Sequence, residues 1–291
     1  MPELPEVETV RRGLERLVVG RRVTELDVLE PKSFQAPEED GMVAVGGHVE
    51  GATLVAARRR AKVLILDLDN GYSLVGHLKM TGQLVVRGTE DWGAGHPTDS
   101  LLGRLPDRST RLRFAFDDGT ELFFNDQRKF GWVRVVPTPL VEELPFIAKL
   151  GPEPLDPAGL PEFRRRVARH LRTTIKAAIL NQEVVAGIGN IYADESLWSV
   201  KVNPARAVAA MSSRKLGELF HAAADVMRLS IDLGGSTDRN YVDAEGNKGS
   251  YLGFANVFRR EGEPCSRCGT AILKTRVAGR GTHYCPKCQL R

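Results

Sequence analysis

Four cysteines near the end of the chain constrain its fold more than any other feature. They occur as two pairs, Cys265-x2-Cys268 and Cys285-x2-Cys288, separated by sixteen residues. This spacing is typical of a site in which four thiolates hold one Zn2+ tetrahedrally. Two disulfides are the alternative, but they need an oxidising compartment that nothing else in the sequence indicates. The sequence therefore predicts one structural zinc ion in a small finger.

Positive charge is concentrated in the same segment. Between Arg259 and Arg291 there are eight lysines and arginines against two glutamates, a local charge of +6, although the whole chain carries only +4. Basic charge packed into a short module is expected of a protein that binds a polyanion. Four thiolates on one Zn2+ carry a net charge of −2, so part of this basic charge offsets the zinc site itself.

The start of the chain, Met1-Pro2-Glu3, combines a possible nucleophile with a possible proton donor. If Met1 is removed, the terminal group is the amine of Pro2, and an α-amino group has a pKa of about 7.7 to 8.0. A secondary amine that attacks a sugar aldehyde carbon forms an iminium ion that cannot become a neutral imine, so it remains an electron sink. Glu3 can move protons at the same centre. Taken alone, the two positions also fit a solvated chain end without a function.

A helix is expected directly after these residues. Pro5 suits a first helical turn, apolar residues from Val7 to Leu17 recur at helical spacing, and Gly20 ends the pattern. The positive end of the helix dipole would favour an ionised Glu3 and a deprotonated amine at Pro2.

The first half of the chain reads as a β-sandwich. Short β-rich runs follow one another between Arg22 and Val136, with hairpin-type turns at 69–71 and 117–119, and many short antiparallel strands favour a sandwich. The polar stretch from Arg87 to Thr110 is long for an unstructured loop. The expected strands are Val23 to Leu29, Lys62 to Leu68, Tyr72 to Leu78, Leu84 to Val86, Arg111 to Phe116, Glu121 to Phe124 and Trp132 to Val136.

The second half reads as helical, so the 291 residues form an α+β protein of two domains. A glycine-rich turn, 184–190, separates two short helices and resembles a helix-turn-helix arrangement, with Asn190 placed to offer its amide and free backbone N–H groups to a phosphate. The expected helices are Pro161 to Leu171, Thr173 to Leu180, Ile191 to Val200 and Ser212 to Leu233. The predicted domains are 1–137, a linker 138–151, a helical domain 152–257 with a polar loop 234–253, and the finger 258–291.

The basic run Arg58-Arg59-Arg60-Ala61-Lys62 leads into a strand. A run of this kind is as compatible with a solvated face as with a binding site, and Lys62, nearest the strand, suits a phosphate contact or proton transfer. No apolar run approaches the roughly 20 residues that span a bilayer, and the charged start lacks the apolar stretch of a signal peptide. We therefore expect an intracellular, cytoplasmic protein without a membrane partner.

Five motifs in order give the chain a specific resemblance. It is similar along essentially its whole length to the bacterial formamidopyrimidine-DNA glycosylase and endonuclease VIII family, whose members are DNA glycosylases that also cleave abasic sites. The motifs are Pro2-Glu3-Leu4-Pro5-Glu6-Val7-Glu8-Thr9, His77-Leu78-Lys79-Met80-Thr81-Gly82, Asp126-Gln127-Arg128-Lys129-Phe130-Gly131, Gly187-Ile188-Gly189-Asn190-Ile191-Tyr192-Ala193, and the zinc finger with Gly279-Arg280-Gly281-Thr282.

The resemblance implies a fold and a set of roles. The fold is an N-terminal antiparallel β-sandwich with an N-terminal helix, followed by a helix-two-turn-helix domain with a four-cysteine zinc finger. Pro2 is then the nucleophile at C1′ and Glu3 the proton donor, while Lys62 and Arg280 are the cations of the elimination steps. The implied DNA-binding residues are Met80, Ser109, Arg128, Phe130, Arg172, Lys176, Asn190 and Tyr241, with Met80 and Phe130 as wedges and Arg128 bonding the orphaned base.

Some positions depart from the family pattern. Ser109 stands where members often carry a DNA-contacting histidine, and Lys79, Gln127 and Lys129 vary their motifs. The loop 234–253, which contains Tyr241, corresponds to the family's flap over a flipped purine.

The resemblance implies excision of oxidised purines, chiefly 8-oxoguanine and formamidopyrimidines, from double-stranded DNA, followed by strand cleavage at the abasic site. The chain would act as a monomer with one structural Zn2+ and no redox cofactor. Two alternatives remain: an endonuclease VIII-like enzyme for oxidised pyrimidines, and an inactive protein that only binds damaged DNA.

Overall fold

The computed structural model describes residues 2–39, 42–43, 46–96, 98–236 and 251–290. Contacts within the chain divide it into two units. The first comprises residues 1–148 and 234–250, and the second comprises 149–233 and 251–291. The domain boundaries read from the sequence, at 137/138, 151/152 and 257/258, stay predictions.

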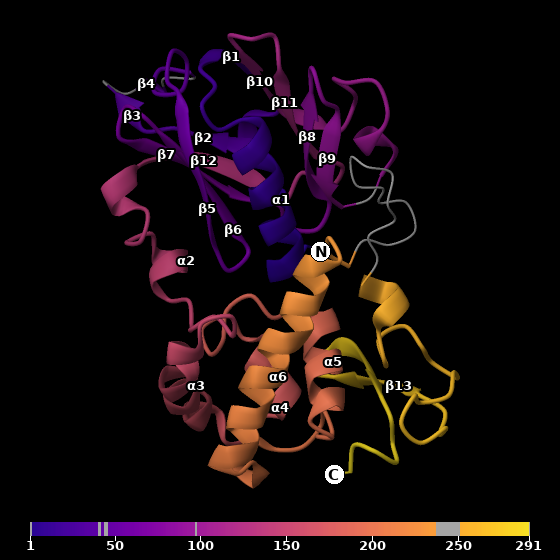
Figure 1. The fold of residues 1–291 in the computed structure, drawn as a ribbon. Coiled ribbons are helices and arrows are strands. Elements are labelled where there is room, and N and C mark those ends of the chain that lie inside the picture. The colour runs from indigo at the N-terminus through magenta and orange to yellow at the C-terminus, as the bar shows by residue number, and fades with distance from the viewer. Residues whose placement is uncertain (1, 40–41, 44–45, 97, 237–250, 291) are drawn as a thin grey trace. The chain divides into compact units, whose positions relative to one another are not determined.

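Two five-stranded sheets packed face to face form the first unit (Figure 1). Their strand orders are β1-β10-β11-β8-β9 and β2-β12-β7-β6-β5, and every neighbouring pair except β2 and β12 is antiparallel. The strands are β1 (Val23–Val28), β2 (Phe34–Gln35), β5 (Leu54–Arg60), β6 (Val63–Leu68), β7 (Tyr72–His77), β8 (Gly82–Arg87), β9 (Trp92–Gly95), β10 (Thr110–Phe116), β11 (Glu121–Asp126) and β12 (Trp132–Pro137), with a separate pair β3 (Glu38–Glu39) and β4 (Met42–Val43).

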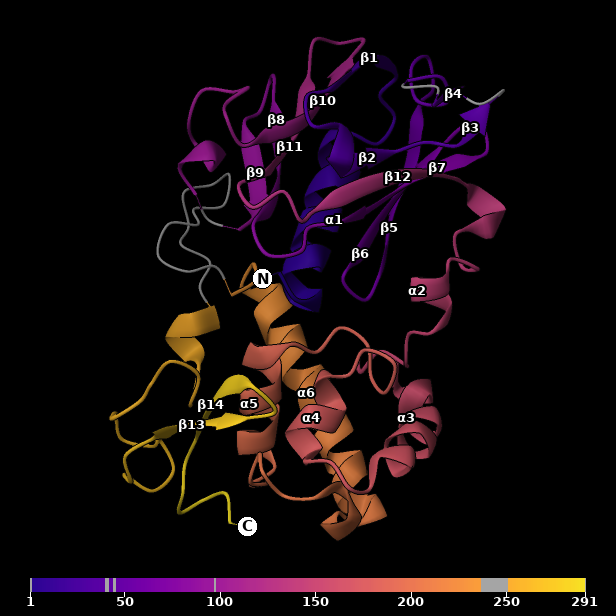
Figure 2. The same ribbon diagram turned by 180° about the vertical axis from the view of Figure 1, so that it is seen from behind.

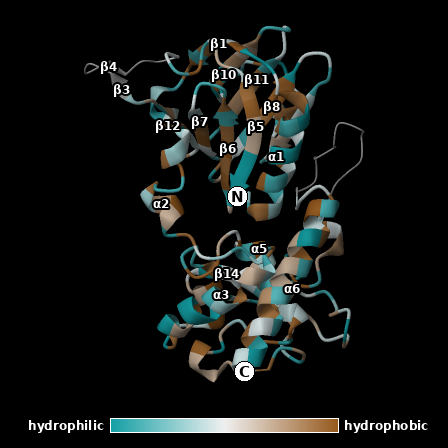
Figure 3. Ribbon diagram, turned by 60° about the vertical axis from the view of Figure 1, so that its left-hand side comes forward, coloured by the Kyte–Doolittle hydropathy of each residue, from teal (hydrophilic) through white to brown (hydrophobic). Residues whose placement is uncertain are grey.

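Alternating side chains build the core between these sheets. Leu112, Phe114 and Phe116 of β10 are all buried, whereas Arg113 between them pairs with Asp27 of β1 at 2.6 Å. The strands of this unit accordingly carry much of the hydrophobic colour in Figure 3. All seven strands expected from the sequence are present, and the turns at 69–71 and 117–119 connect antiparallel neighbours.

Five strands of this unit, β2, β3, β4, β5 and β9, were not expected from the sequence. β5 contains the arginine run, and β9 lies inside the polar stretch from Arg87 to Thr110, which also contains a short 3-10 turn at Asp99–Leu101. The physical reason lies in tertiary contacts. Arg58 and Arg59 of β5 form ion pairs within this unit, and the buried indole of Trp92 on β9 packs on helix α1.

Helix α1 (Leu4–Leu17) confirms the expected N-terminal helix and packs on β5 and β9. A short helix, α2 (Pro145–Ala148), ends the continuous part of the first unit. On α1, Gly13 lies directly under the Trp92 ring, so that a Cβ at this position would be 2.0 Å from Trp92 Cζ2. Only glycine allows this approach of helix and strand.

The second unit packs helices around one that is buried on all sides (Figure 2). Residues Tyr192 to Trp198 of α5 are all buried, and α5 packs on α4, α6 and the finger. Thr174 and Ser212 cap α4 and α6 by accepting backbone N–H groups at 3.3 and 3.2 Å. The helices are α3 (Leu160–Val167), α4 (Ile175–Leu180), α5 (Asn190–Ser199) and α6 (Ser213–Asp232), and the finger contains β13 (Leu273–Val277) and β14 (Arg280–Tyr284).

A buried ion pair joins the finger to the helices. Lys176 of α4 donates to Asp194 of α5 at 2.6 Å, to Thr282 Oγ1 at 2.8 Å and to Gly281 O at 3.1 Å. The second oxygen of Asp194 accepts the His283 N–H at 2.9 Å. Lys176 and Asp194 are both 0% exposed, so each charge depends on the other for its compensation. The hairpin that carries Arg280 is thereby held on α4 and α5.

Among the described residues, no helix has both the length and the apolar composition needed to cross a bilayer.

We predict that Gly13→Ala destabilises the protein. The added methyl group would force the buried Trp92 ring to move, and such overpacking costs about 1 to 3 kcal/mol. Denaturant unfolding measures the change. Gly217→Ala on α6 is the matched control, because its Cβ would meet only the end of the flexible Arg164 side chain, at 2.7 Å. The control should leave stability unchanged or raise it by up to about 1 kcal/mol through helix propensity. A Gly13→Ala protein as stable as the control would contradict the prediction.

We also predict that Lys176→Met is strongly destabilising. It leaves the Asp194 carboxylate buried without its cation, which costs about 3 to 5 kcal/mol. Lys215→Met is the control, since Lys215 pairs with Glu218 on the surface and exposed pairs contribute about 0 to 1 kcal/mol. Both variants are compared by urea unfolding, and equal losses in the two would refute the role of burial.

Candidate functional site

The start of the chain is fixed on the first turn of α1. Pro2 and Glu3 are buried, and Glu3 is the extended residue that caps the helix. The backbone N–H of Glu3 donates to Glu6 Oε2 at 2.7 Å, which closes a capping box. The Glu3 carboxyl therefore lies at the positive end of the helix dipole, as expected from the sequence.

Glu6 also holds the beginning of the polar loop. Its second oxygen, Oε1, accepts the Ser236 N–H at 2.8 Å, and Gly235 approaches Glu6 with a φ of +96° that favours glycine. Glu6 was not expected to have a role, although its place three residues after the cap is the usual capping-box position. Tyr241 and the rest of the predicted flap at 237–250 lie outside the described residues.

Lys62 and Lys79 place positive charge near the His77 ring in the same unit. Lys62 is buried directly before β6, after Ala61 with a φ of +53°. Burial and the nearby charges of Lys79 and Lys62 lower the pKa of His77 to about 3. Its Nδ1 accepts the Lys79 N–H at 2.9 Å. The ring is therefore neutral at physiological pH, with its proton on Nε2.

The neighbouring arginines serve the fold. Arg58 pairs with Asp67 at 2.5 Å, and Arg59 of β5 pairs with Glu8 of α1 at 3.1 Å. Although burial opposes ionisation, the hydrogen bonds from Arg11 and Arg59 lower the pKa of Glu8. Arg59 thus fixes α1 on the sheet, and Arg58 joins β5 to β6, so both are paired within the fold and neither is a free anion site.

The two expected wedge residues, Met80 and Phe130, and Arg128, expected to bond the orphaned base, are exposed at one end of the sandwich. Met80 and Phe130 are 37% and 51% exposed, which is unusual for large apolar side chains and excludes a core role for them. The guanidinium of Arg128 lies 4.7 Å from the centre of the Phe130 ring.

Ser109 is less accessible than expected for a DNA contact. It is 4% exposed, and its hydroxyl donates to Asp107 Oδ1 at 2.7 Å, 3.1 Å from the Ser100 hydroxyl. These bonds, with those from Ser100 and the neighbouring amides, lower the pKa of Asp107 despite its burial. In this structure Ser109 stabilises a turn.

In the second unit, the cations differ in exposure. Arg172 and Arg280 are exposed, with Arg280 at the start of β14. Asn190 opens α5 and donates from Nδ2 to Gly281 O at 2.9 Å, so it lies against the same hairpin. Lys176 does not face outward as expected, because its amino group is enclosed by Asp194 and the finger. Only the tertiary structure shows this partner.

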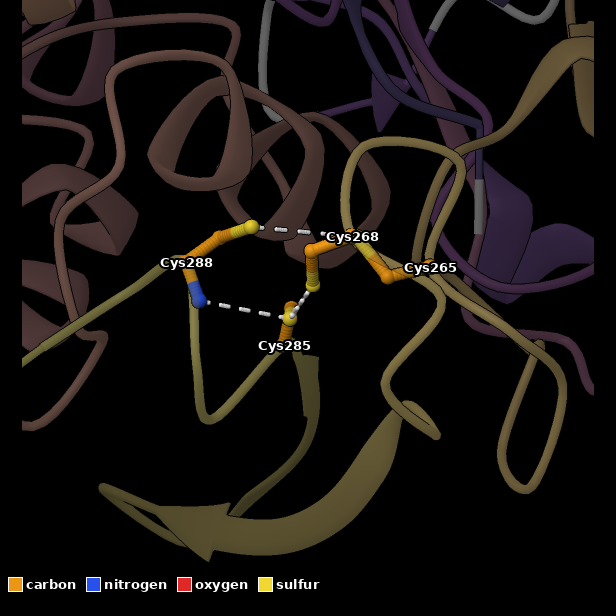
Figure 4. Close-up of side chains that lie close together, drawn as sticks. All are labelled: Cys265, Cys268, Cys285 and Cys288. Carbon is orange, nitrogen blue, oxygen red and sulfur yellow. Dashed lines mark hydrogen bonds between the residues drawn. The ribbon is translucent and has the colours of Figure 1, made fainter.

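The four cysteines converge on a single site, as Figure 4 shows. Their sulfur atoms all lie within 4.8 Å of one another, with 3.5 Å between Cys268 and Cys285 and 4.0 Å between Cys265 and Cys288. Tetrahedral Zn–S bonds of about 2.3 Å place sulfurs roughly 3.8 Å apart. Hydrogen bonds from Thr270 lower the pKa of Cys268 to about 6, which supplies a thiolate at neutral pH. The donor set fits one structural zinc ion, and none of the four is in a disulfide.

Three acidic residues that sequence reasoning did not single out organise these groups: Glu6, Asp126 and Asp194. Asp126 lies inside a quoted motif, and Asp194 occurs on a helix without a polar face. For Asp194, an acid on a helix without a polar face is the signal that the sequence offers.

Family models match the chain in three consecutive segments. The formamidopyrimidine-DNA glycosylase N-terminal domain matches residues 1–133, the formamidopyrimidine-DNA glycosylase H2TH domain matches 150–241, and a zinc finger found in FPG and IleRS matches 262–291.

Relatives match over nearly their whole length. The formamidopyrimidine-DNA glycosylase of Pelotomaculum thermopropionicum is 38% identical to this chain, over 99% of both chains. That of Enterococcus faecalis is 39% identical, over 99% of this chain and 97% of its own length. The Lactococcus lactis enzyme in complex with DNA containing an abasic site is 33% identical, with a TM-score of 0.84 over 100% of both chains. A variant of that enzyme with Fapy-dG containing DNA gives a TM-score of 0.85 at the same identity and coverage.

The matched segments follow the order of sandwich, helices and finger seen in the structure, so this chain belongs to the formamidopyrimidine-DNA glycosylase family, the glycosylases of base-excision repair.

Proposed function

We propose that this protein excises oxidised purines, 8-oxoguanine and formamidopyrimidines, from duplex DNA and then cleaves the strand at the resulting abasic site. The observation that carries the proposal is the placement of Pro2 and Glu3 together at the N-terminus of α1, with the glutamate buried. A protein that only binds DNA has no use for a terminal secondary amine next to a buried carboxyl group.

The proposed reaction follows from this pair. After removal of Met1, the Pro2 nitrogen attacks C1′ of the damaged nucleotide, and the bond from C1′ to the base breaks. Glu3 donates a proton to the sugar ring oxygen, so that the ring opens and an iminium ion forms between Pro2 and C1′. Loss of the C2′ proton then expels the 3′ phosphate, and a second elimination expels the 5′ phosphate.

Cations of both units support these steps. Lys62 is the cation in the first unit, and Arg280 in the second is exposed on the finger hairpin. We propose that Arg172, Arg280 and Asn190 bind DNA phosphates, because an exposed guanidinium or amide at a helix start suits an anion. Lys176 contributes to DNA binding indirectly, because it holds the finger hairpin that carries Arg280. Ser109 likewise contributes indirectly, because it stabilises the turn that contains Asp107.

Base flipping is assigned to the exposed wedge residues. A base in a duplex cannot reach the Pro2 amine without leaving the stack, which costs a few kcal/mol. Met80 and Phe130 would fill the vacated space, and Arg128 would bond the orphaned partner base. The Lactococcus lactis relative was solved with abasic-site, Fapy-dG and oxidised-pyrimidine containing DNA, which supports damaged DNA as the partner.

We predict that borohydride traps the Met-processed protein covalently on a duplex with one 8-oxoguanine opposite cytosine. Reduction converts the iminium ion into a stable amine, and mass mapping should locate the adduct on Pro2. A variant that retains an N-terminal tag is the control, since it lacks the free amine. It should lose trapping and cleavage while it keeps DNA binding.

Other outcomes change the proposal in distinct ways. Unchanged cleavage by the tagged variant would remove Pro2 from the mechanism. An adduct on an abasic duplex or on an oxidised-pyrimidine duplex, but not on the 8-oxoguanine duplex, would refute the purine assignment and retain the chemistry. The absence of any adduct would favour a protein that only binds DNA.

We predict that removal of zinc weakens DNA binding. The native protein should release one equivalent of zinc to a strong chelator, and loss of the ion unfolds the finger that presents Arg280. Affinity for an abasic-analogue duplex, measured by fluorescence anisotropy, should fall by at least about tenfold as phosphate contacts are lost. Readdition of zinc should restore it, and unchanged affinity of the zinc-free protein would contradict a role of the finger in binding.

A further inference from the structure

Two loops connect the sheets of the first unit at the end where the wedge residues lie. One, residues 78–81, links β7 to β8, and the other, residues 127–131, links β11 to β12. Each passes from one sheet to the other. Their ends are also opposite one another, because Asp126 pairs with Gly82 and Trp132 pairs with His77 in the strand registers. We call them the crossover loops.

The carboxylate of Asp126 joins the two crossover loops. Its Oδ1 accepts the hydroxyl of Thr81 in the first loop and the Arg128 N–H in the second, at 3.1 Å for the latter. Its Oδ2 accepts the N–H groups of Phe130 at 2.8 Å and Gly131 at 2.6 Å. The Thr81 hydroxyl also accepts the Arg128 N–H at 3.1 Å. Four donors from two loops therefore meet one carboxylate.

Asp126 is itself held rigidly. It is 0% exposed, its N–H donates to Ser109 O at 2.8 Å, and its carbonyl oxygen accepts the Arg111 Nε–H at 2.7 Å. Arg111 is buried on β10. The Asp126 carboxylate is thus held as firmly as the sheet, although Arg128 and Phe130, whose N–H groups it accepts, have exposed side chains.

Close packing at both loops makes the arrangement specific. A Cβ on Gly131 would be 2.6 Å from Phe124 Cζ and 3.1 Å from Asp126 Oδ2, and a Cβ on Gly82 would be 2.4 Å from Leu78 O. Lys79 and Lys129, one in each loop, have φ values of +50° and +56°. Backbones so folded cannot form a regular hydrogen-bond ladder, and the carboxylate accepts the N–H groups that remain.

Besides Gln127 and Lys129, these loops expose the side chains of Met80, Arg128 and Phe130. Arg128 and Phe130 donate their own backbone N–H groups to the Asp126 carboxylate. Met80 directly precedes Thr81, whose hydroxyl donates to the same carboxylate. A group that must enter a base stack as a unit loses less conformational freedom when its backbone is already fixed.

We propose that Asp126 is the positioning residue that fixes Met80, Arg128 and Phe130 relative to one another, so that they enter the DNA together. The inference rests on the proposed function, in which these side chains replace a flipped nucleotide. Asp126 itself touches no DNA and acts through the two crossover loops.

The test is Asp126→Asn, which keeps the size of the side chain. An amide has one acceptor oxygen and one donor nitrogen, so in either orientation an NH2 group would face at least one backbone N–H that now donates to the carboxylate. Entry into DNA is measured with 2-aminopurine opposite a tetrahydrofuran abasic analogue, a duplex that needs no base excision. The insertion rate or amplitude should fall at least about tenfold, by analogy with the loss of about one charge-assisted hydrogen bond. Strand cleavage at an abasic site in single-stranded DNA, where no stack is entered, should stay within about twofold of wild type.

Matched variants separate positioning from general damage. Asp67→Asn changes a different carboxylate of this unit, which is partly buried and bonded to Arg58 and Ser73, and this variant should insert as the wild type does. Should Asp126→Asn fail to fold, Thr81→Val removes one donor without changing the shape of the side chain and should show part of the insertion defect. Thr81→Ser retains the hydroxyl and should restore insertion.

Normal insertion by both Asp126→Asn and Thr81→Val would overturn the inference, as would an equal loss on single-stranded abasic DNA. The wild type could insert into the abasic duplex and yet excise no 8-oxoguanine, which would refute the purine assignment. In that case, loss of insertion by the variants would still support the role of Asp126. A wild type that inserts into no duplex would overturn both.

Discussion

Buried carboxylates that accept backbone N–H groups are the interaction on which the candidate site depends. Loops and chain ends cannot bond their own amides in a ladder, and a buried amide without a partner is costly. Glu6 accepts the N–H groups of Glu3 and Ser236, and Asp126 accepts three N–H groups of one crossover loop. Glu195, buried on α5, accepts those of Asn256, Val257 and Phe258 just before the finger. Each irregular segment is thus fixed by an acid from a regular element.

The candidate groups are distributed over the two units, and each unit orders its own. Pro2, Glu3 and Lys62 belong to the sandwich, where α1 and the turn before β6 hold them. Asn190 and Arg280 belong to the helical unit, where Lys176 and Asp194 fasten the hairpin. Because each set is fixed within its unit, the proposed reaction needs DNA to engage both units and needs neither unit to refold.

Charge in this protein has two uses that composition cannot separate. Arg58, Arg59 and Lys176 pair with acids and hold elements together, whereas Arg172 and Arg280 are exposed. The exposed and the paired cations lie close in sequence, so a count of positive residues overstates the surface available to a polyanion. The same holds for apolar residues, since exposed Phe130 follows the buried Phe123 and Phe124 of β11 by only a few positions.

Local chemistry allowed much of this to be predicted. The cysteine spacing specified the zinc site, Pro5 and Gly20 bounded α1, and the turn residues at 69–71 and 117–119 specified two hairpins, because each depends on residues close in the chain. The motifs identified the family. Met80, Arg128 and Phe130 are exposed, and their use in DNA binding stays a prediction.

What required the tertiary structure was every feature whose partner is distant in sequence. β5 and β9 form because Arg59 meets Glu8 and Trp92 covers Gly13, contacts over 51 and 79 residues that no local pattern contains. The burial of Lys176 depends on Asp194 and on a hairpin about a hundred residues later, and the role of Asp126 depends on Thr81, 45 residues earlier. The sequence by itself determined the metal, the turns and the family; only the fold decided which charged residues are partners of one another and which remain exposed, because desolvation and pairing are properties of positions in space.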